Sequence, residues 1–99
     1  MFRTLFGDTP RVRILDFLAD HVDFDYSITD ISNGSEVPRN TVYRNLKSLV
    51  SESIMVQTRL DGPSRMFQLN LKNPKVQALL RFEMDVINES ESQRKIILR

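Results

Sequence analysis

The sequence contains no cysteine, which excludes disulfides, thiolate metal sites and a cysteine nucleophile. It also lacks any apolar run close to the roughly 18–20 residues that span a bilayer, and residues 1–13 lack the apolar core of a secretory signal. A chain of 99 residues suits one domain with one core. We therefore expect a cytoplasmic protein that is stabilised by packing, with oligomerisation as a further source of stability.

The sequence also has little that supports catalysis or metal binding. Its one histidine, His21, has no second histidine and no carboxylate cluster at metal-ligand spacing nearby. Asp16, Asp20, Asp23 and Asp25 lack the glycine-turned loop of a calcium site, and we interpret them as surface residues. No glycine-rich phosphate loop, no nucleophile with a base and no acid/base pair is recognisable. The sequence thus predicts a protein that is not an enzyme and needs no cofactor or metal.

The charge is nearly balanced, at +1, but it is unevenly distributed. Residues 1–36 carry three arginines against seven acids, whereas residues 37–72 carry six basic residues against Glu52 and Asp61. One basic face on a nearly neutral chain attracts a polyanion, while the acidic remainder limits indiscriminate binding. This distribution favours nucleic-acid binding, with chance clustering as the alternative.

Local signals predict helices at 10–21, 28–33 and 38–52. Thr9 and Pro10 suit the start of the first helix, Ser27 and Asp30 have capping-box spacing for the second, and Gly34 is expected to end the second. A short extended piece is predicted before the second helix, at 24–27. The residues expected to be buried are Leu15, Leu18, Ala19 and Val22 in the first helix and Val42, Leu46, Leu49 and Val50 in the third.

The C-terminal half predicts a β-hairpin followed by a long helix. Residues 54–60 and 66–71 alternate with a period of two around a turn at 61–64, which gives a hairpin over 54–71. The last helix starts near Pro74 and is apolar over more of its surface than one core-facing stripe requires, which predicts a partner. Its apolar residues are Val76, Leu79, Leu80, Phe82, Met84, Val86 and Ile87, and Phe2, Leu5 and Phe6 are further candidates for that contact. The element order is that of an α+β fold, a winged helix-turn-helix with an added C-terminal helix.

The segment SITDISNGSEVPRNTVYRNLKSLVSESIMVQTRLDGPSRMFQLN resembles the winged helix-turn-helix domains of MarR-like and ArsR-like regulators, particularly small archaeal ones. Its most specific part is TVYRNLKSL, and the resemblance covers roughly residues 5–72. Gly34, Thr41 and Gly62 stand where these families place the small residue of the turn, the polar residue opening the reading helix and the glycine of the wing. Two positions depart from the pattern: Pro38 replaces a capping residue, and Ser32 replaces an alanine, which predicts looser helix packing.

The exposed side of the 38–52 helix offers arginine and asparagine, which bond guanine and adenine edges in the major groove, and it carries no acid. We expect the first turns of this helix to read bases, and the wing to touch phosphates or a narrow minor groove. The base-edge candidates are Arg39, Asn40, Tyr43 and Arg44, and the backbone candidates are Thr41, Lys47, Arg59 and Arg65. The alternatives are a solvated helix face, a hairpin solubilised by its arginines, and a Tyr43 packed against the first helix.

Together these features predict a transcriptional regulator that binds double-stranded DNA sequence-specifically as a homodimer. Residues 1–72 would form the DNA-binding domain, and residues 73–99 the dimerisation helix. The alternatives are a winged-helix protein-interaction module and a non-specific DNA-organising protein. Nothing in the sequence indicates a small-molecule effector.

Overall fold

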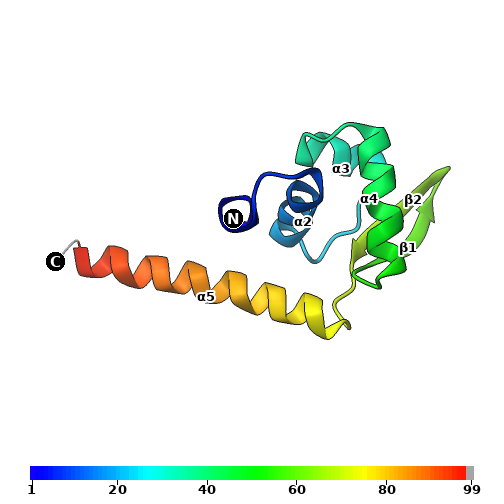
Figure 1. The fold of residues 1–99 in the computed structure, drawn as a ribbon. Helices are drawn as coiled ribbons and strands as arrows, with labels where there is room; N and C mark the ends of the chain where they lie inside the picture. The colour runs from blue at the N-terminus through cyan, green and yellow to red at the C-terminus, as the bar shows by residue number, and fades with distance from the viewer. Residues whose placement is uncertain (98–99) are drawn as a thin grey trace.

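The computed structural model describes residues 1–97, with side chains through Glu89. Its elements are α1 (Phe2–Phe6), α2 (Pro10–Asp20), α3 (Ile28–Ser35), α4 (Arg39–Ser51), β1 (Met55–Asp61), β2 (Ser64–Leu69) and α5 (Pro74–Ile97). Helices α1 to α4 and the hairpin form one body, and α5 leaves the base of the hairpin and extends past the N-terminal segment (Figure 1). The predicted α+β order of helices and hairpin is confirmed, with α1 as an unpredicted addition. Within the described part of the chain, no helix is both long and apolar enough to cross a membrane.

Two helices begin where their capping residues predict. The Thr9 side chain accepts a hydrogen bond from the Val12 N–H, and Pro10 occupies the first turn of α2. At α3 the Ser27 hydroxyl accepts from the Asp30 N–H, and the Asp30 carboxylate accepts from the Ser27 N–H, both at 3.1 Å. These reciprocal bonds satisfy backbone donors that the first turn of a helix leaves unpaired.

Gly34 does not end α3, contrary to the sequence prediction. The left-handed residue at the end of this helix is Glu36, with a φ of 58°. Gly34 lies inside α3 beneath the ring of Phe17, which also packs edge-on against Tyr26 at 4.8 Å between ring centroids. A Cβ at residue 34 would overlap the Phe17 ring. The glycine therefore allows α2 and α3 to approach closely.

The turn between α3 and α4 is held by Ser32, the position where looser packing was expected. Its hydroxyl donates a 2.6 Å hydrogen bond to the Val37 carbonyl, and the Val37 N–H donates to the Ser32 carbonyl. Val37 is buried in the core. Ser32 thus ties the turn to the end of α3, and the looser helix packing expected at this position stays a prediction.

The core lies between α1 to α4, the base of the hairpin and the start of α5. The predicted burial is confirmed for Leu18, Ala19, Val42, Leu46 and Leu49, and for Val76 in α5. Leu15 and Val22 are only half-buried, and Val50 is exposed. Phe2, expected at an interface between chains, is instead buried in the core of its own chain.

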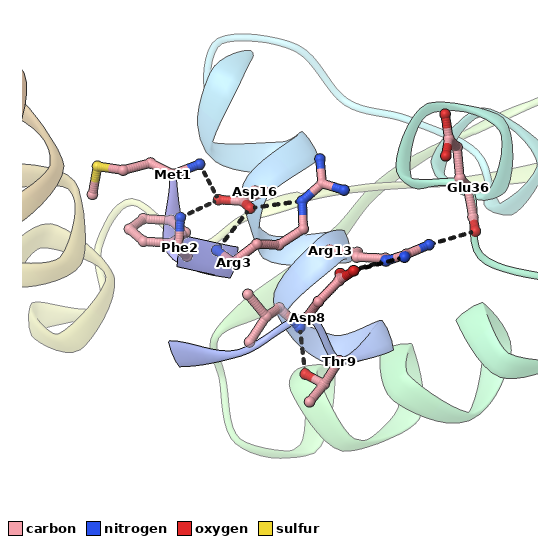
Figure 2. A network of polar contacts seen from close by, with 9 residues as sticks. Met1, Phe2, Arg3, Asp8, Thr9, Arg13, Asp16 and Glu36 are labelled. Carbon is pink, nitrogen blue, oxygen red and sulfur yellow. Dashed lines mark hydrogen bonds and ion pairs between the residues drawn. The ribbon is translucent and has the colours of Figure 1, made fainter. Parts of the chain in front are cut away.

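Asp16, interpreted from the sequence as a surface residue, is 5% exposed and binds the N-terminal segment (Figure 2). Its Oδ1 accepts from the Met1 ammonium at 3.2 Å and from the Phe2 N–H at 2.7 Å, and its Oδ2 accepts from the Arg3 N–H at 3.2 Å. Burial alone would raise the pKa of Asp16, but these hydrogen bonds lower it below its usual value. The carboxylate thereby docks α1 on α2.

The hairpin is packed at its base and exposed at its tip. Strands β1 and β2 pair antiparallel from Met55 opposite Leu69 to Asp61 opposite Ser64. Met55 and Leu69 are buried, whereas Leu60, near the tip, is largely exposed. The predicted extended piece before α3 is reduced to one bridge, in which Tyr26 and Phe67 exchange two 2.8 Å backbone hydrogen bonds. The far half of the hairpin therefore projects from the body as a wing.

Candidate nucleic-acid interface

The outer face of α4 is polar, basic and free of acids. Val42, Leu46 and Leu49 bury one side of the helix, which leaves the other side in solvent. None of the thirteen residues of α4 is acidic. The exposed candidates are Arg39, Asn40, Tyr43, Arg44 and Lys47, and Thr41 is half-buried. The sequence-predicted residues of this helix therefore share one accessible surface.

Neighbouring side chains on α4 support one another locally. The Arg44 guanidinium donates to the Thr41 hydroxyl at 3.3 Å. The Lys47 ammonium lies 5.2 Å from the centroid of the Tyr43 ring, which is within the range of a cation–π contact. Tyr43 is 51% exposed. Its ring lies beside Lys47 and faces the wing, so the alternative of packing against the first long helix is wrong.

A groove separates α4 from the wing, and we call it the helix–wing groove. One end, of about 390 Å³, is lined by Arg39 and Tyr43 of α4, Arg65 of β2 and the start of α3 at Ser27 and Thr29. The other end, of about 400 Å³, is lined by Tyr43, Lys47, Arg65 and apolar residues, including Phe67. The structure thus brings Arg65 together with Arg39, Tyr43 and Lys47, whereas Asn40, Thr41 and Arg44 do not line this groove. The sequence did not predict that the start of α3 lines this groove, because Ser27 was interpreted only as the cap of its own helix.

Arg59, by contrast, is separated from the other candidates. Its Nε and Nη2 donate to the two carboxylate oxygens of Asp25 at 2.9 and 3.2 Å, and the Thr58 hydroxyl donates to Asp25 Oδ2 at 2.5 Å. The Arg59 guanidinium and the Thr58 hydroxyl lower the pKa of Asp25 to about 2. Asp25, which the sequence reading placed at the surface without a role, therefore holds β1.

Ion pairing divides the basic residues into two groups. Along residues 1–89, Arg3, Arg11, Arg13 and Arg59 each pair with a carboxylate. No such partner is found in this range for Arg39, Arg44, Lys47 or Arg65. The positive charge around the helix–wing groove is thus available to an external anion. Among the same residues, no group of three or more acidic or histidine side chains is arranged to hold a metal ion.

Residues 12–59 match the model of the IclR helix-turn-helix domain. This segment is thus similar to an IclR-type helix-turn-helix domain. The match runs from α2 through α3 and α4 into β1, and so includes all the α4 candidates and Arg59. Arg65 and α5 lie beyond the matched segment of the IclR-type domain.

Solved structures with the same architecture include the ferric uptake regulator of Francisella tularensis with iron, which is 31% identical with a TM-score of 0.56 over 66% of this chain. The present chain covers 53% of that regulator, about half of its length. A homodimeric winged helix-turn-helix DNA-binding domain from Mycobacterium bovis, described as a possible ArsR-family transcriptional regulator, is 21% identical with a TM-score of 0.62, over 93% of this chain and 79% of that one. A MarR-family transcriptional regulator from Silicibacter pomeroyi is 19% identical with a TM-score of 0.61, over 85% and 54%.

A comparison with curated protein sequences finds no match. The matched domain and the solved structures nevertheless agree on the fold. The matched segment, the hairpin wing and α5 form a winged helix-turn-helix with an added C-terminal helix, the fold of the structures from Mycobacterium bovis and Silicibacter pomeroyi. In this fold α3 and α4 correspond to the two helices of the motif, of which the second enters the major groove in helix-turn-helix proteins that bind DNA.

Proposed function

We propose that the protein is a transcriptional regulator without enzymatic activity, which binds double-stranded DNA sequence-specifically as a homodimer. The observation that carries this proposal is the exposed, acid-free face of α4. Its cations Arg39 and Lys47 line the helix–wing groove with Arg65 and have no carboxylate partner among residues 1–89. A helix with such a face fits the major groove, and a wing carrying an arginine fits the adjacent backbone or minor groove.

The candidate residues fall into two groups, those placed to approach base edges and those placed to contact the phosphate backbone. Arg39, Asn40, Tyr43 and Arg44, in the first two turns of α4, are proposed to approach base edges. Thr41, Lys47 and Arg65 are proposed to contact the phosphate backbone, which positions the helix without reading sequence. Arg59 stands apart from this set because its guanidinium is already paired with Asp25.

Residues 1–72 are proposed as the DNA-binding domain and the helix after them as the dimerisation element. Phe82, Met84 and Ile87 of α5 are exposed, as are Leu5 and Phe6 of α1. The rings of Phe6 and Phe82 lie 6.3 Å apart between centroids, so α1 and α5 contribute to one apolar surface. The similar domain from Mycobacterium bovis is homodimeric. A two-fold dimer would place two copies of α4 on half-sites about one helical turn apart.

Selection from a random DNA pool, followed by affinity measurements at about 50 and 200 mM salt, tests the DNA-binding proposal. One sequence, with two related half-sites, should be enriched. Its affinity should fall on the order of 100-fold between these salt concentrations, because Lys47 and Arg65 of each protomer would neutralise about four phosphates in a dimer, each contributing about 0.9 to the salt slope. Thr41 is uncharged and adds nothing to this slope. Equal retention of all sequences would favour a DNA-organising protein, and salt-insensitive or absent binding would favour a protein-interaction module.

Lysine at both Phe82 and Ile87 should convert the dimer to a monomer. Both side chains are exposed in the single chain, so the new charges can reach water without unfolding it, whereas in a dimer they would be buried in an apolar contact. Sedimentation at micromolar concentration would give the mass of one chain instead of two. Asn88→Lys, which adds the same charge at an exposed polar position of α5, should remain dimeric. A wild-type protein that sediments as a monomer would contradict the proposal.

A further inference from the structure

We propose that Asp25 is an internal substitute for a DNA phosphate, which withdraws Arg59 from DNA so that the wing contacts the duplex through Arg65. This inference rests on the proposed DNA-binding function and adds a residue that limits non-specific affinity. Asp25 belongs to the segment between α2 and α3, outside α4 and outside the wing.

The contact occupies the donors that a phosphate would need. Arginine binds carboxylates and phosphates through the same pair of parallel N–H donors. In Arg59 the Nε and Nη2 donors are both directed at Asp25, at 2.9 and 3.2 Å. The Asp25 side chain is 16% exposed and that of Arg59 is 57% exposed. The carboxylate is therefore largely enclosed by its partners, and a phosphate must displace it to engage this guanidinium by the same two donors.

The position of Asp25 is set by its neighbours in the chain. Tyr26, the next residue, is joined to Phe67 of β2 by two 2.8 Å backbone hydrogen bonds. Thr58 donates to the Asp25 carboxylate and also to the Met66 carbonyl, at 3.3 Å. Because both strands of the wing are tied to this segment, the carboxylate is held in place before DNA arrives. Such preorganisation removes the entropic cost that two freely moving surface side chains must overcome.

A bulge in β1 turns Arg59 toward Asp25 and away from the helix–wing groove. Gln57 pairs with Phe67 and Arg59 with Met66, so Thr58 is the additional residue. Cross-strand partners share a face of the hairpin and successive residues alternate between faces. Arg59 therefore shares a face with Met66, whereas Arg65 pairs with Leu60 on the opposite face. In an unbulged strand Arg59 would lie on the same face as Gln57, which lines the groove with Arg65.

As a result of this pairing, Arg65 is the wing arginine that is left to neutralise a DNA phosphate. Each phosphate neutralised by a protein cation contributes about 0.9 to the salt dependence of DNA affinity, whatever the sequence. Pairing with Asp25 removes that contribution for Arg59 and leaves it for Arg65. The pair also persists over the ordinary pH range, because the pKa of Asp25 is about 2. Because this contribution does not depend on sequence, its removal lowers the affinity for any duplex and leaves discrimination between sequences to contacts with base edges.

The test is binding of a random-sequence duplex, by fluorescence anisotropy between about 50 and 200 mM NaCl. Asp25→Asn keeps the size of the side chain and removes its charge. This variant should bind about five- to tenfold more tightly at 100 mM NaCl, with a slope steeper by about 0.9 per chain. Arg59→Ala should leave slope and affinity within about twofold of wild type, and the double variant should return to wild type. Arg65→Ala should reduce the slope by about 0.9 per chain.

Asp23→Asn is the matched control, since it removes the same charge at an exposed position two residues away. It should change the affinity by less than about twofold. The ¹⁵Nε–¹H resonance of Arg59 should also stay at the same position when DNA is added, because the pair with Asp25 is retained in the complex.

Two results would overturn the inference while leaving the proposed function intact. The first is a loss of slope in Arg59→Ala, which would mean that Arg59 contacts DNA. The second is unchanged or weaker binding by Asp25→Asn in a protein that melts at the wild-type temperature. This result would mean that Asp25 does not withdraw Arg59 from DNA, whether or not it helps to position the wing. If neither wild type nor Asp25→Asn binds DNA at low salt, the proposed function fails and the inference fails with it.

Discussion

Glutamate at both Arg44 and Lys47 is expected to abolish DNA binding, with a loss of about 1,000-fold or more at 100 mM salt. A single contact of this kind contributes about 1–3 kcal/mol, and reversal of the charge adds repulsion from the phosphates. In a homodimer each loss occurs twice. The fold should be retained, because both side chains are exposed and α4 is held by its opposite, buried side.

Lys72→Glu with Lys75→Glu is the matched control for this variant. It makes the same change in charge at two exposed positions, one just before α5 and one in its first turn. We expect a decrease of less than about tenfold, from the long-range field alone. Equal loss in the two double variants would mean that net charge, and not the α4 surface, governs binding. Full binding by the Arg44 and Lys47 variant would remove α4 from the interface.

Alanine at Asp16 is expected to lower the free energy of unfolding by about 3 kcal/mol, because it breaks a buried network of hydrogen bonds and two ion pairs, with the Met1 ammonium and with Arg3. The change leaves the Met1 ammonium and the Phe2 and Arg3 N–H groups without their acceptor. It also loosens Phe2, which is part of the core. For a domain of this size the melting temperature should fall by roughly 12–24 °C. Thermal and urea unfolding measure both quantities.

Asp20→Ala is the control for Asp16→Ala, because Asp20 is exposed one turn further along α2. It should cost less than about 0.5 kcal/mol, as is usual for surface positions. A loss for Asp16→Ala as small as that of the control would show that the N-terminal segment does not depend on this carboxylate. DNA affinity should not differ between the two variants once both are folded.

The stability difference between wild type and Asp16→Ala should depend on pH in a defined direction. The hydrogen bonds from the N-terminal segment outweigh burial and lower the pKa of Asp16. The stabilisation by its carboxylate is therefore fully present above the ordinary aspartate pKa, about 3.9, and is lost as the pH falls through the lower folded value. The two unfolding free energies should converge in that acid range.

Glu83 of α5 contributes to the pH dependence in the opposite direction. Burial and then the nearby Asp20 raise the pKa of Glu83, so its protonation as the pH falls removes a buried charge.

Much of the fold follows from interactions within a few residues. The starts of α2 and α3 are set by side chains that bond a backbone N–H three residues later. The exposed face of α4 follows from apolar residues at helical spacing, because a helix that buries one side must expose the other. For the same reason the α4 candidates were identified from the sequence, and the structure places them together on one surface.

Only the tertiary structure decided which neighbours the remaining residues have. Gly34 is required because a ring from another helix lies on it, and Asp16 is buried because the N-terminal segment folds back over it. Arg59 lies 34 residues from the aspartate that binds it, and one additional residue in β1 determines the face on which it lies. Residue type and spacing along the chain do not specify contacts over such separations, since these depend on how whole elements pack. The sequence therefore determined which helix presents a basic, acid-free face, and the packing of the wing against the α2–α3 segment decided that Arg59 is paired.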